Sequence, residues 1–123
     1  MVKVLFDTNI LIDYLNGVAD AATEIERHRD KAISLITWME VMAGATAQDE
    51  PIIKTFLSQF ELLPIDGAVS TAAVAIRRTR KIKLPDATIL ATARSTGRML
   101  ITRNTRDFPA GQEVDVRMPY QFP

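Results

Sequence analysis

The sequence contains no cysteine and only one histidine, and these two shortages exclude several kinds of chemistry. Without cysteine there is no disulfide framework and no thiolate nucleophile. A zinc site usually takes nitrogen and sulfur ligands, and a single histidine, His28, cannot supply such a set. We interpret His28 instead as an exposed residue of a charged helix.

Long apolar runs are also missing. The N-terminal MVKVLF is shorter than the apolar region of a signal peptide, and no run approaches the ~18 residues of a membrane span. The expected compartment is therefore the cytoplasm, with no membrane partner. A length of 123 residues fits a single domain, expected to occupy residues 1–123, and it can bury a core without disulfide or metal staples.

The chain has no net charge, but its charges are unevenly distributed. Residues 1–61 hold five basic and ten acidic side chains, whereas residues 62–123 hold ten basic and five acidic ones. One basic run comprises Arg77, Arg78, Arg80, Lys81 and Lys83. Such a run can present a basic surface to phosphates. It is equally typical of a solvated helix C-terminus, where the helix dipole favours cations.

Strand-like and helix-like patterns alternate along the chain. Short apolar segments predict strands at 2–6, 31–36, 60–66, 98–102 and 114–118. Helical patterns occupy 9–16, 19–29, 37–44, 50–62, 67–81 and 84–97. Thr37 and Glu40 have the spacing of a capping box that begins the third helix. The alternation predicts an α/β fold with a central parallel sheet of about four to five strands and helices on both faces.

Several acidic or amide side chains follow the predicted strands, at the edge where parallel sheets bind ligands. Asp7 follows the first strand, Glu40 lies beyond the second, and Asn104 and Asp107 lie beyond the fourth. Asp86 begins the helix before the fourth strand, and its spacing does not show whether it reaches the same edge.

Each acid has an ordinary structural explanation. Asp7 can cap a helix, which contributes about 1 kcal/mol, and Asp86 can complement a helix dipole. Asp107 can lie in a turn, and we interpret Asp66 as a turn or cap residue. Grouped carboxylates are different, because two of them ~5 Å apart repel by about 3 kcal/mol at an effective dielectric near 20. A hard divalent cation removes that repulsion and takes oxygen ligands, so the group favours a metal site.

Four blocks, LFDTNILIDYL, ITWMEVMAG, LPDATILATA and LITRNTRDF, resemble the PIN domain in order and over nearly the whole chain. More narrowly, they resemble the VapC-type toxins of bacterial and archaeal toxin–antitoxin pairs. The resemblance implies RNA cleavage at an acidic cluster that binds Mg²⁺ or Mn²⁺, with the first three acids at Asp7, Glu40 and Asp86. The fourth position is Asn104, where many relatives have Asp. Asn brings an oxygen but no charge, and Asp107 can supply the missing carboxylate.

The resemblance also implies roles for other residues. Four polar positions that support the acids or the phosphate in the family are matched by Thr8, Asn9, Thr37 and Arg103. A metal held by Asp7 and Asp86 lowers the pKa of a bound water and stabilises the phosphoryl oxygens, and Glu40 orients the water or acts as general base. We infer that the basic run guides the RNA backbone.

Partners follow from the same resemblance. The family forms homodimers and is inhibited by a cognate antitoxin, whose tail enters the active-site groove and which usually also binds operator DNA. Trp38, Met39 and Met42 lie beside Glu40 and are possible groove contacts, although we expect at least two of the three in the core.

Three other functions are compatible with parts of this sequence. A response-regulator receiver needs two acids after its first strand and a late lysine, but this chain has one acid there and no lysine beyond Lys83. A haloacid-dehalogenase-type phosphatase needs Asp-x-Asp where this chain has Asp7-Thr8-Asn9. The serious alternative is a catalytically inactive PIN fold that binds RNA or a protein partner, which only Asn104 supports.

Overall fold

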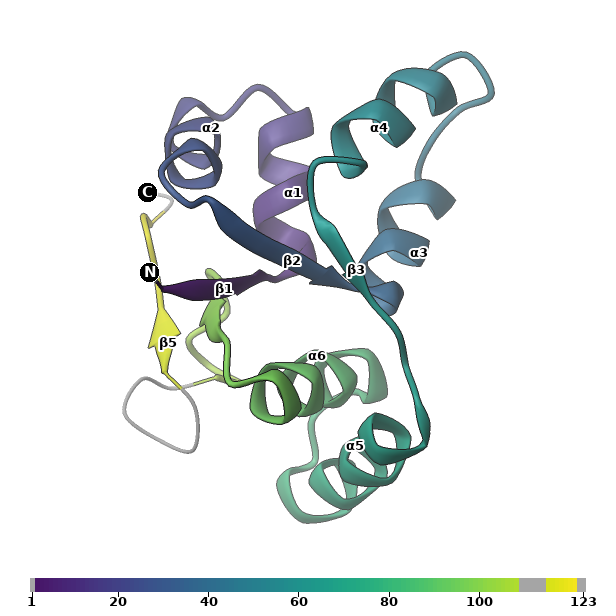
Figure 1. Ribbon diagram of the computed structural model, residues 1–123, viewed down its shortest axis with the longest axis vertical. Coiled ribbons are helices and arrows are strands. Elements are labelled where there is room, and N and C mark those ends of the chain that lie inside the picture. The colour runs from purple at the N-terminus through teal and green to yellow at the C-terminus, as the bar shows by residue number, and fades with distance from the viewer. Residues whose placement is uncertain (1, 109–114, 122–123) are drawn as a thin grey trace.

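The structure is a computed structural model that describes residues 2–108 and 115–121 (Figure 1). Its centre is a parallel sheet in which the described strands follow the order β3-β2-β1-β4-β5. The strands are β1 (Lys3–Phe6), β2 (Asp30–Ser34), β3 (Glu61–Leu63), β4 (Met99–Ile101) and β5 (Val116–Arg117). The predicted α/β fold with a parallel sheet is confirmed.

Helices cover both faces of this sheet. They are α1 (Thr8–Leu15), α2 (Ala19–Glu26), α3 (Leu35–Ala43), α4 (Glu50–Leu57), α5 (Gly67–Arg80) and α6 (Leu84–Thr96). Figure 1 shows α5 and α6 on one side of the sheet and α1, α2 and α4 on the other. None of the helices formed by the described residues has the length and apolar content needed to span a membrane.

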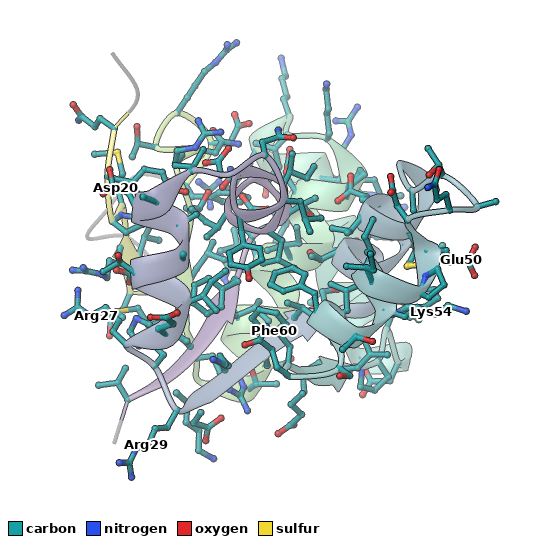
Figure 2. The ribbon with its side chains drawn as sticks, turned by 90° about the horizontal axis from the view of Figure 1, so that it is seen from above. Asp20, Arg27, Arg29, Glu50, Lys54 and Phe60 are labelled. Atoms are coloured by element: carbon teal, nitrogen blue, oxygen red, sulfur yellow. The ribbon has the colours of Figure 1, made fainter. Side chains whose placement is uncertain are left out.

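The two layers arise because side chains alternate along a strand. In β1, Leu5 packs into the cluster beneath α5 and α6, whereas Val4 and Phe6 pack into the cluster beneath α1, α2 and α4. All three side chains are fully buried, as expected for the central strand of a parallel sheet. Several charged residues of α2 and α4 point outward instead, among them Asp20, Glu50 and Lys54, as does Arg27 at the C-cap of α2 (Figure 2). β1 is therefore buried between the two layers of helices, and Asp7 follows its carboxyl end.

The start of α3 differs from the prediction. β2 ends at Ser34, and the Ser34 hydroxyl caps α3 by accepting a hydrogen bond from the backbone N–H of Ile36 at 3.2 Å. The predicted capping box of Thr37 and Glu40 is therefore wrong, because Thr37 already lies inside the helix and is fully buried. Serine caps as well as threonine does, and the apolar residues after Ser34 continue as helix instead of strand.

Other boundaries are shorter than predicted. The segment 60–66 forms a strand only over Glu61–Leu63, because Pro64 has no N–H to donate to a ladder. The helix 50–62 is confined to Glu50–Leu57. The strand 98–102 is reduced to Met99–Ile101, and the strand 114–118 to Val116–Arg117, with position 114 outside the described residues.

His28 is not the exposed helix residue that the sequence suggested. It follows the end of α2, and its side chain is only 11% exposed. Its ring meets Phe6 edge-to-face with centroids 5.9 Å apart, and its Nε2 lies 2.9 Å from an oxygen of Glu24. The hydrogen-bonding and aromatic partners explain why a histidine in a charged stretch turns inward.

Candidate active site

Asp7 lies where β1 ends and α1 begins. Its backbone N–H donates to the carbonyl of Ile101 at 2.9 Å, which joins it to the end of β4. Its carboxylate is the N-cap of α1 and accepts from the backbone N–H of Thr8 at 2.7 Å. The side chain is only 3% exposed. The capping explanation for Asp7 is thus correct, and it leaves one carboxylate oxygen for further contacts.

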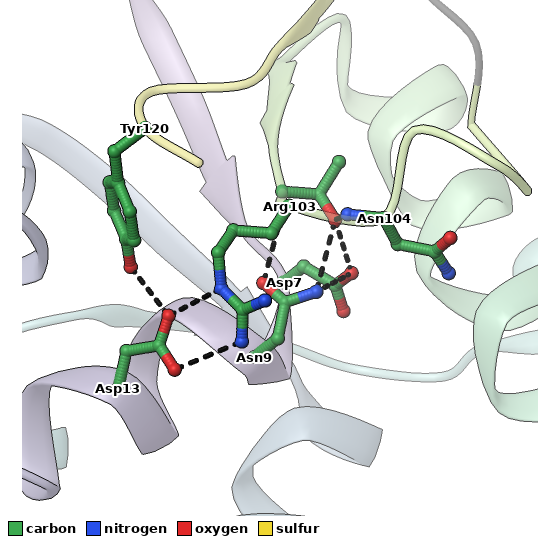
Figure 3. A network of polar contacts seen from close by, with 7 residues as sticks. Asp7, Asn9, Asp13, Arg103, Asn104 and Tyr120 are labelled. Carbon is green, nitrogen blue, oxygen red and sulfur yellow. Dashed lines mark hydrogen bonds and ion pairs between the residues drawn. The ribbon is translucent and has the colours of Figure 1, made fainter. Parts of the chain in front are cut away.

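That second oxygen is held by Thr102 and Asn9. The hydroxyl of Thr102 donates to Oδ2 of Asp7 at 2.7 Å, and the amide of Asn9 donates to the same oxygen at 3.2 Å. The Thr102 hydroxyl oxygen also accepts from the Asn9 amide at 3.2 Å and from the backbone N–H of Asn104 at 2.9 Å (Figure 3). Because these two donors occupy the lone pairs of Thr102, its hydrogen is directed at Asp7.

Glu40 projects from α3 toward the start of α1. Its carboxylate accepts from the hydroxyl of Thr8 at 2.7 Å, and the same Thr8 oxygen lies 3.0 Å from the hydroxyl oxygen of Thr37. A hydroxyl has one hydrogen, so donation from Thr8 to Glu40 makes Thr37 the donor to Thr8. Thr37 is buried and Glu40 is exposed, so this chain of hydroxyls runs from the core to the surface.

Asp86 reaches the same edge of the sheet from the first turn of α6. Its side chain is half-buried, and burial raises its pKa, as do the charges of Asp107 and Glu40, with Lys83 acting in the opposite direction. The question that its sequence spacing left open is therefore answered by its neighbours: Asp86 shares an electrostatic environment with the acids that follow β2 and β4.

The grouping of acids is strongest at Asp7. Burial raises the pKa of its carboxyl from 3.8 to about 6, against the hydrogen bonds from Thr102 and Thr8, which lower it. The negative charges of Asp86 and Glu40 raise the pKa further. At Asp7, burial and the acidic neighbours thus outweigh the hydrogen bonds, and a cation bound beside the carboxylate would lower its pKa.

Asn104 and Asp107 face each other across a tight turn. The amide of Asn104 donates to the carboxylate of Asp107 at 3.0 Å, and the backbone N–H of Asp107 donates to the amide oxygen of Asn104 at 3.2 Å. Arg80 donates to the backbone carbonyl of Asp107 at 2.9 Å, which ties this turn to the end of α5. The structure thus places Asp107 in a turn, as its ordinary explanation predicted. Asp107 is also near enough to Asp86 for its negative charge to raise the pKa of Asp86.

Arg103 belongs to a network that the sequence did not reveal. Its guanidinium makes two contacts with Asp13, at 2.5 Å through Nε and 3.0 Å through a terminal nitrogen, and Tyr120 donates its hydroxyl to Asp13 at 2.7 Å (Figure 3). Asp13 is only 3% exposed. The available signal was an acid on the apolar face of α1, where Asp13 is buried together with Ile10 and Leu11.

The basic run lies at the end of α5 and just after it. Arg77, Arg78, Lys81 and Lys83 are exposed, while Arg80 is half-buried against the turn at Asp107. Lys81 ends the helix with a positive φ of 55°, so the chain changes direction sharply here. Part of the run therefore caps the helix C-terminus, and the exposed remainder is available to a polyanion.

A groove of about 430 Å³ adjoins the acids. It lies between α1, α3 and α4 and is lined by Ile12, Leu15, Asn16, Glu40, Val41, Gly44, Asp49, Ile52 and Ile53. Ile12 and Ile52 are exposed apolar side chains, 42% and 72% accessible. Of the three residues beside Glu40, Trp38 and Met42 pack partly buried against the core and Met39 is exposed, so two of the three contact the core as expected.

The donor set suits a hard cation by its chemistry, since the side chains of Asp7, Glu40, Asp86, Asn104 and Asp107 offer only oxygen as a ligand atom. In residues 2–108 and 115–121, however, no three acidic, histidine or cysteine side chains are grouped closely enough to hold a metal as they stand. The described residues therefore fit a divalent ion in type and charge but do not form a complete set of ligands as they stand.

Comparison with known proteins agrees with this arrangement. A family model described as the PIN domain matches residues 4–112. The tRNA(fMet)-specific endonuclease VapC of Shigella flexneri is 32% identical over 120 residues, which cover 88% of this chain and 91% of that protein. A chain of a toxin-antitoxin complex from Klebsiella pneumoniae has a TM-score of 0.90 at 45% identity and covers 98% of this chain and 100% of its own. DNA-bound VapBC from Salmonella typhimurium shares the fold, with a TM-score of 0.80 at 24% identity over 95% of this chain and 98% of that one.

Proposed function

The chain belongs to the PIN-domain family and is of the VapC type, and from that premise we propose that it is a metal-dependent endoribonuclease, the toxin of a toxin–antitoxin pair. The observation that carries the proposal is the environment of Asp7. Its carboxyl is buried among other acids, and its pKa is raised to about 6. A bound cation would offset this repulsion, and Mg²⁺ or Mn²⁺ suits a site whose ligand atoms are all oxygen.

In the proposed site Asp7, Glu40 and Asp86 hold the ion, with Asn104 or Asp107 as a further oxygen ligand. When bound, the metal supplies a water of lowered pKa and stabilises charge on the phosphoryl oxygens. Thr102 and Asn9 keep the Asp7 carboxylate in one orientation through their hydrogen bonds.

Glu40 has a different task from Asp7. Thr8 holds one of its oxygens, while the side chain as a whole is exposed. Its charge is therefore oriented but accessible, which suits a general base or a residue that orients the attacking water. Thr37 supports this orientation from the core through the hydroxyl of Thr8.

The exposed basic residues Arg77, Arg78, Lys81 and Lys83 are proposed to guide the RNA backbone. Arg80 contributes differently, because it anchors the turn that carries Asp107. Because the Shigella flexneri relative is named as a tRNA(fMet)-specific endonuclease, a tRNA is the first substrate to test. Sequence preference depends on surface shape and loops more than on the acids.

The antitoxin is proposed to dock in the groove between α1, α3 and α4, where exposed Ile12 and Ile52 lie beside Glu40. A segment seated there reaches the acids and so blocks substrate. Operator DNA would be contacted through the antitoxin. We also propose a homodimer, supported by exposed Val74 and Leu84 on a nearly apolar pocket between α5 and α6, and a single domain over residues 1–123 acting in the cytoplasm.

A catalytically inactive PIN fold that binds RNA or a protein partner remains the second candidate. It is favoured by one observation, the mutual hydrogen bonds of Asn104 and Asp107, which engage both side chains at the position where the family resemblance implies an Asp. The presence of Asp7, Glu40 and Asp86 argues against this candidate, because grouped acids repel one another and a module that binds without cutting does not need them.

The test is cleavage of RNA, tRNA first, by protein freed of any antitoxin, with Mn²⁺, with Mg²⁺ and with excess chelator. Asp86→Asn protein is the control for a contaminating nuclease, because it keeps the shape of the side chain and removes its charge. We expect cleavage that needs metal and disappears in the variant. Equal behaviour of folded wild type and variant would contradict the nuclease and favour the inactive module.

A further inference from the structure

Asp13 is a buried acid for which the proposed reaction has no use. It lies on α1, almost two turns beyond Asp7, and receives three hydrogen bonds, two from the Arg103 guanidinium and one from the Tyr120 hydroxyl. An Arg contact through two nitrogens fixes both the position and the plane of the guanidinium. Asp13 therefore joins α1 to the segment after β4 and to the segment after β5.

The main chain of Arg103 lies inside the candidate active site. Its N–H donates to the amide oxygen of Asn9 at 3.3 Å, and its neighbours in sequence are Thr102 and Asn104, both in contact with the Asp7 network (Figure 3). Since Asn9 accepts through its oxygen from Arg103, its NH₂ group is turned toward Asp7 and Thr102.

A shift of the Arg103 main chain would change the hydrogen bonds that hold Asp7. Without the hydrogen bond to its oxygen, the Asn9 amide is oriented only by its two 3.2 Å contacts to Asp7 and Thr102, and its rotation would take the donor away from one lone pair of Thr102. The Thr102 hydroxyl can then rotate away from Asp7. The side chain of Arg103 points away from the acids toward Asp13, so its effect on Asp7 runs through the main chain.

Tyr120 is suited to a permanent contact of this kind. Burial raises the pKa of its hydroxyl, and the hydrogen bond to Asp13 raises it further, so the group stays protonated and remains a donor. The same segment is anchored a second time, because Arg117 of β5 makes two contacts with the buried Glu24, at 2.8 and 3.1 Å. Tyr120 is thus held in place independently of the contact it makes with Asp13.

We propose that Asp13, Arg103 and Tyr120 form a latch that positions the Asp7 carboxylate, with Tyr120 as a positioning residue contributed by the segment after β5. The proposal rests on the proposed function only in naming Asp7 as a metal ligand. The latch itself is a statement about the order of residues 102–104 and of Asn9, and it can be tested without RNA.

The experiment compares Tyr120→Phe with wild type by amide hydrogen exchange measured by NMR. We expect the Arg103 and Asn104 amides to exchange about fivefold faster, the effect of losing one ordinary hydrogen bond. Tyr14→Phe is the matched control. It also removes a tyrosine hydroxyl, from a residue of α1 that is 37% exposed. In the described part of the chain no hydrogen bond of that hydroxyl is found, and the ring stays stacked on Phe56.

Two further readouts separate positioning from stability. Calorimetric titration with Mn²⁺ alone should show a Kd about fivefold weaker for Tyr120→Phe and unchanged for Tyr14→Phe. The effect is smaller than the roughly tenfold or larger loss expected for a residue that hydrogen-bonds a metal ligand directly, because Tyr120 acts through Asp13 and Arg103. With RNA, kcat should fall while KM stays constant. Arg103→Lys, which keeps the charge but cannot make the two-nitrogen contact, should reproduce the loss.

Exchange rates at Arg103 and Asn104 equal to wild type in Tyr120→Phe would overturn the latch, as would faster exchange distributed over the whole sheet in both tyrosine variants. If wild type cleaves no RNA but the exchange difference is present, the latch stands and the proposed function fails. If wild type cleaves RNA and Tyr120→Phe matches it in exchange, Mn²⁺ affinity and kcat, the function stands and the latch fails.

Discussion

Two carboxylates of this protein have almost no exposed area, yet their pKa values are shifted in opposite directions. Asp7 is 3% exposed and Glu24 is 4% exposed. Burial raises the pKa of both, yet that of Asp7 rises to about 6, whereas hydrogen bonds from Arg117 and His28 bring that of Glu24 down to about 2. The difference lies in depth and in the neighbours: Asp7 lies deep in the protein with acids nearby, whereas Glu24 is covered by the partly exposed basic side chains of Arg27 and Arg117. A small exposed area alone therefore does not separate an acid that stabilises the fold from one suited to bind a cation.

The largest expected effect comes from removing the charge of Glu24. Glu24→Gln leaves Arg117 without its carboxylate, and we expect the free energy of unfolding to fall by about 3 kcal/mol at pH 7, the lower end for a broken buried ion pair, because Arg117 is 35% exposed. Chemical denaturation measures it. Since Glu24 has a lowered pKa, its contribution is present above about pH 4.5 and disappears as the pH falls toward 2, so the variant and wild type should converge in acid. A variant as stable as wild type at pH 7 would break the comparison.

Asp7 is expected to make the free energy of unfolding depend on pH in the opposite direction. In the unfolded chain this carboxyl ionises near pH 4 and in the folded protein near pH 6, so the folded state is favoured in acid and loses stability as the pH rises between these values. Asp7→Asn can keep the helix cap through its oxygen and removes the charge, but its NH₂ group then faces the Thr102 and Asn9 donors, which costs stability at every pH. Relative to wild type, its free energy of unfolding should therefore rise by about 2 kcal/mol between pH 4 and pH 7.5 in the presence of chelator. Denaturation at pH 4 and pH 7.5 checks this, and a variant destabilised equally at both would contradict it.

A divalent ion should act on one carboxylate and leave the other unaffected. At a free Mn²⁺ concentration ten times its Kd, we expect the free energy of unfolding of wild type to rise by about 1.4 kcal/mol. Glu24→Gln should gain the same amount, whereas Asp7→Asn should gain much less. Thermal unfolding with and without Mn²⁺ gives these differences. Stabilisation of Asp7→Asn equal to that of wild type would place the ion elsewhere.

The smallest effect is expected at Arg27, which lies 3.4 Å from Glu24 but has a side chain that is 53% exposed. Solvent screens such a pair, so Arg27→Gln should change the free energy of unfolding by less than about 0.5 kcal/mol. Denaturation at low and high salt measures it. A loss approaching that of Glu24→Gln would mean that the basic residues around Glu24 act as a unit and that Arg117 is not its main partner.

The fold was predictable because alternating strands and helices leave a clear periodic pattern, and β1 is apolar at every buried position. The beginning of α3 was not, because Ser34 and Thr37 are both good caps and only strand pairing decides between them: Ser34 is the last residue of β2 paired with β3. His28 was misjudged for a similar reason, since its partners Phe6 and Glu24 come from other elements.

The candidate site divides in the same way. Asp7, Glu40 and Asp86 follow from motif resemblance, and local sequence explains the turn at Asn104 and Asp107. The contacts of Asp13 could not be predicted, because Arg103 and Tyr120 lie 90 and 107 positions away in sequence and meet it only after the sheet has formed.

The central place of β1 has a consequence for how the protein is made. β1 is synthesised first, yet it pairs on one side with β2 and on the other with β4, where Leu5 meets Leu100. Contacts between residues so distant in sequence form late in folding. Until β4 has been translated and has added to the sheet, Asp7 lacks both the Ile101 carbonyl and the Thr102 hydroxyl. A nascent chain therefore carries Asp7 and Glu40 long before it carries an assembled site, and any activity of that site begins only after the sheet is complete through β4.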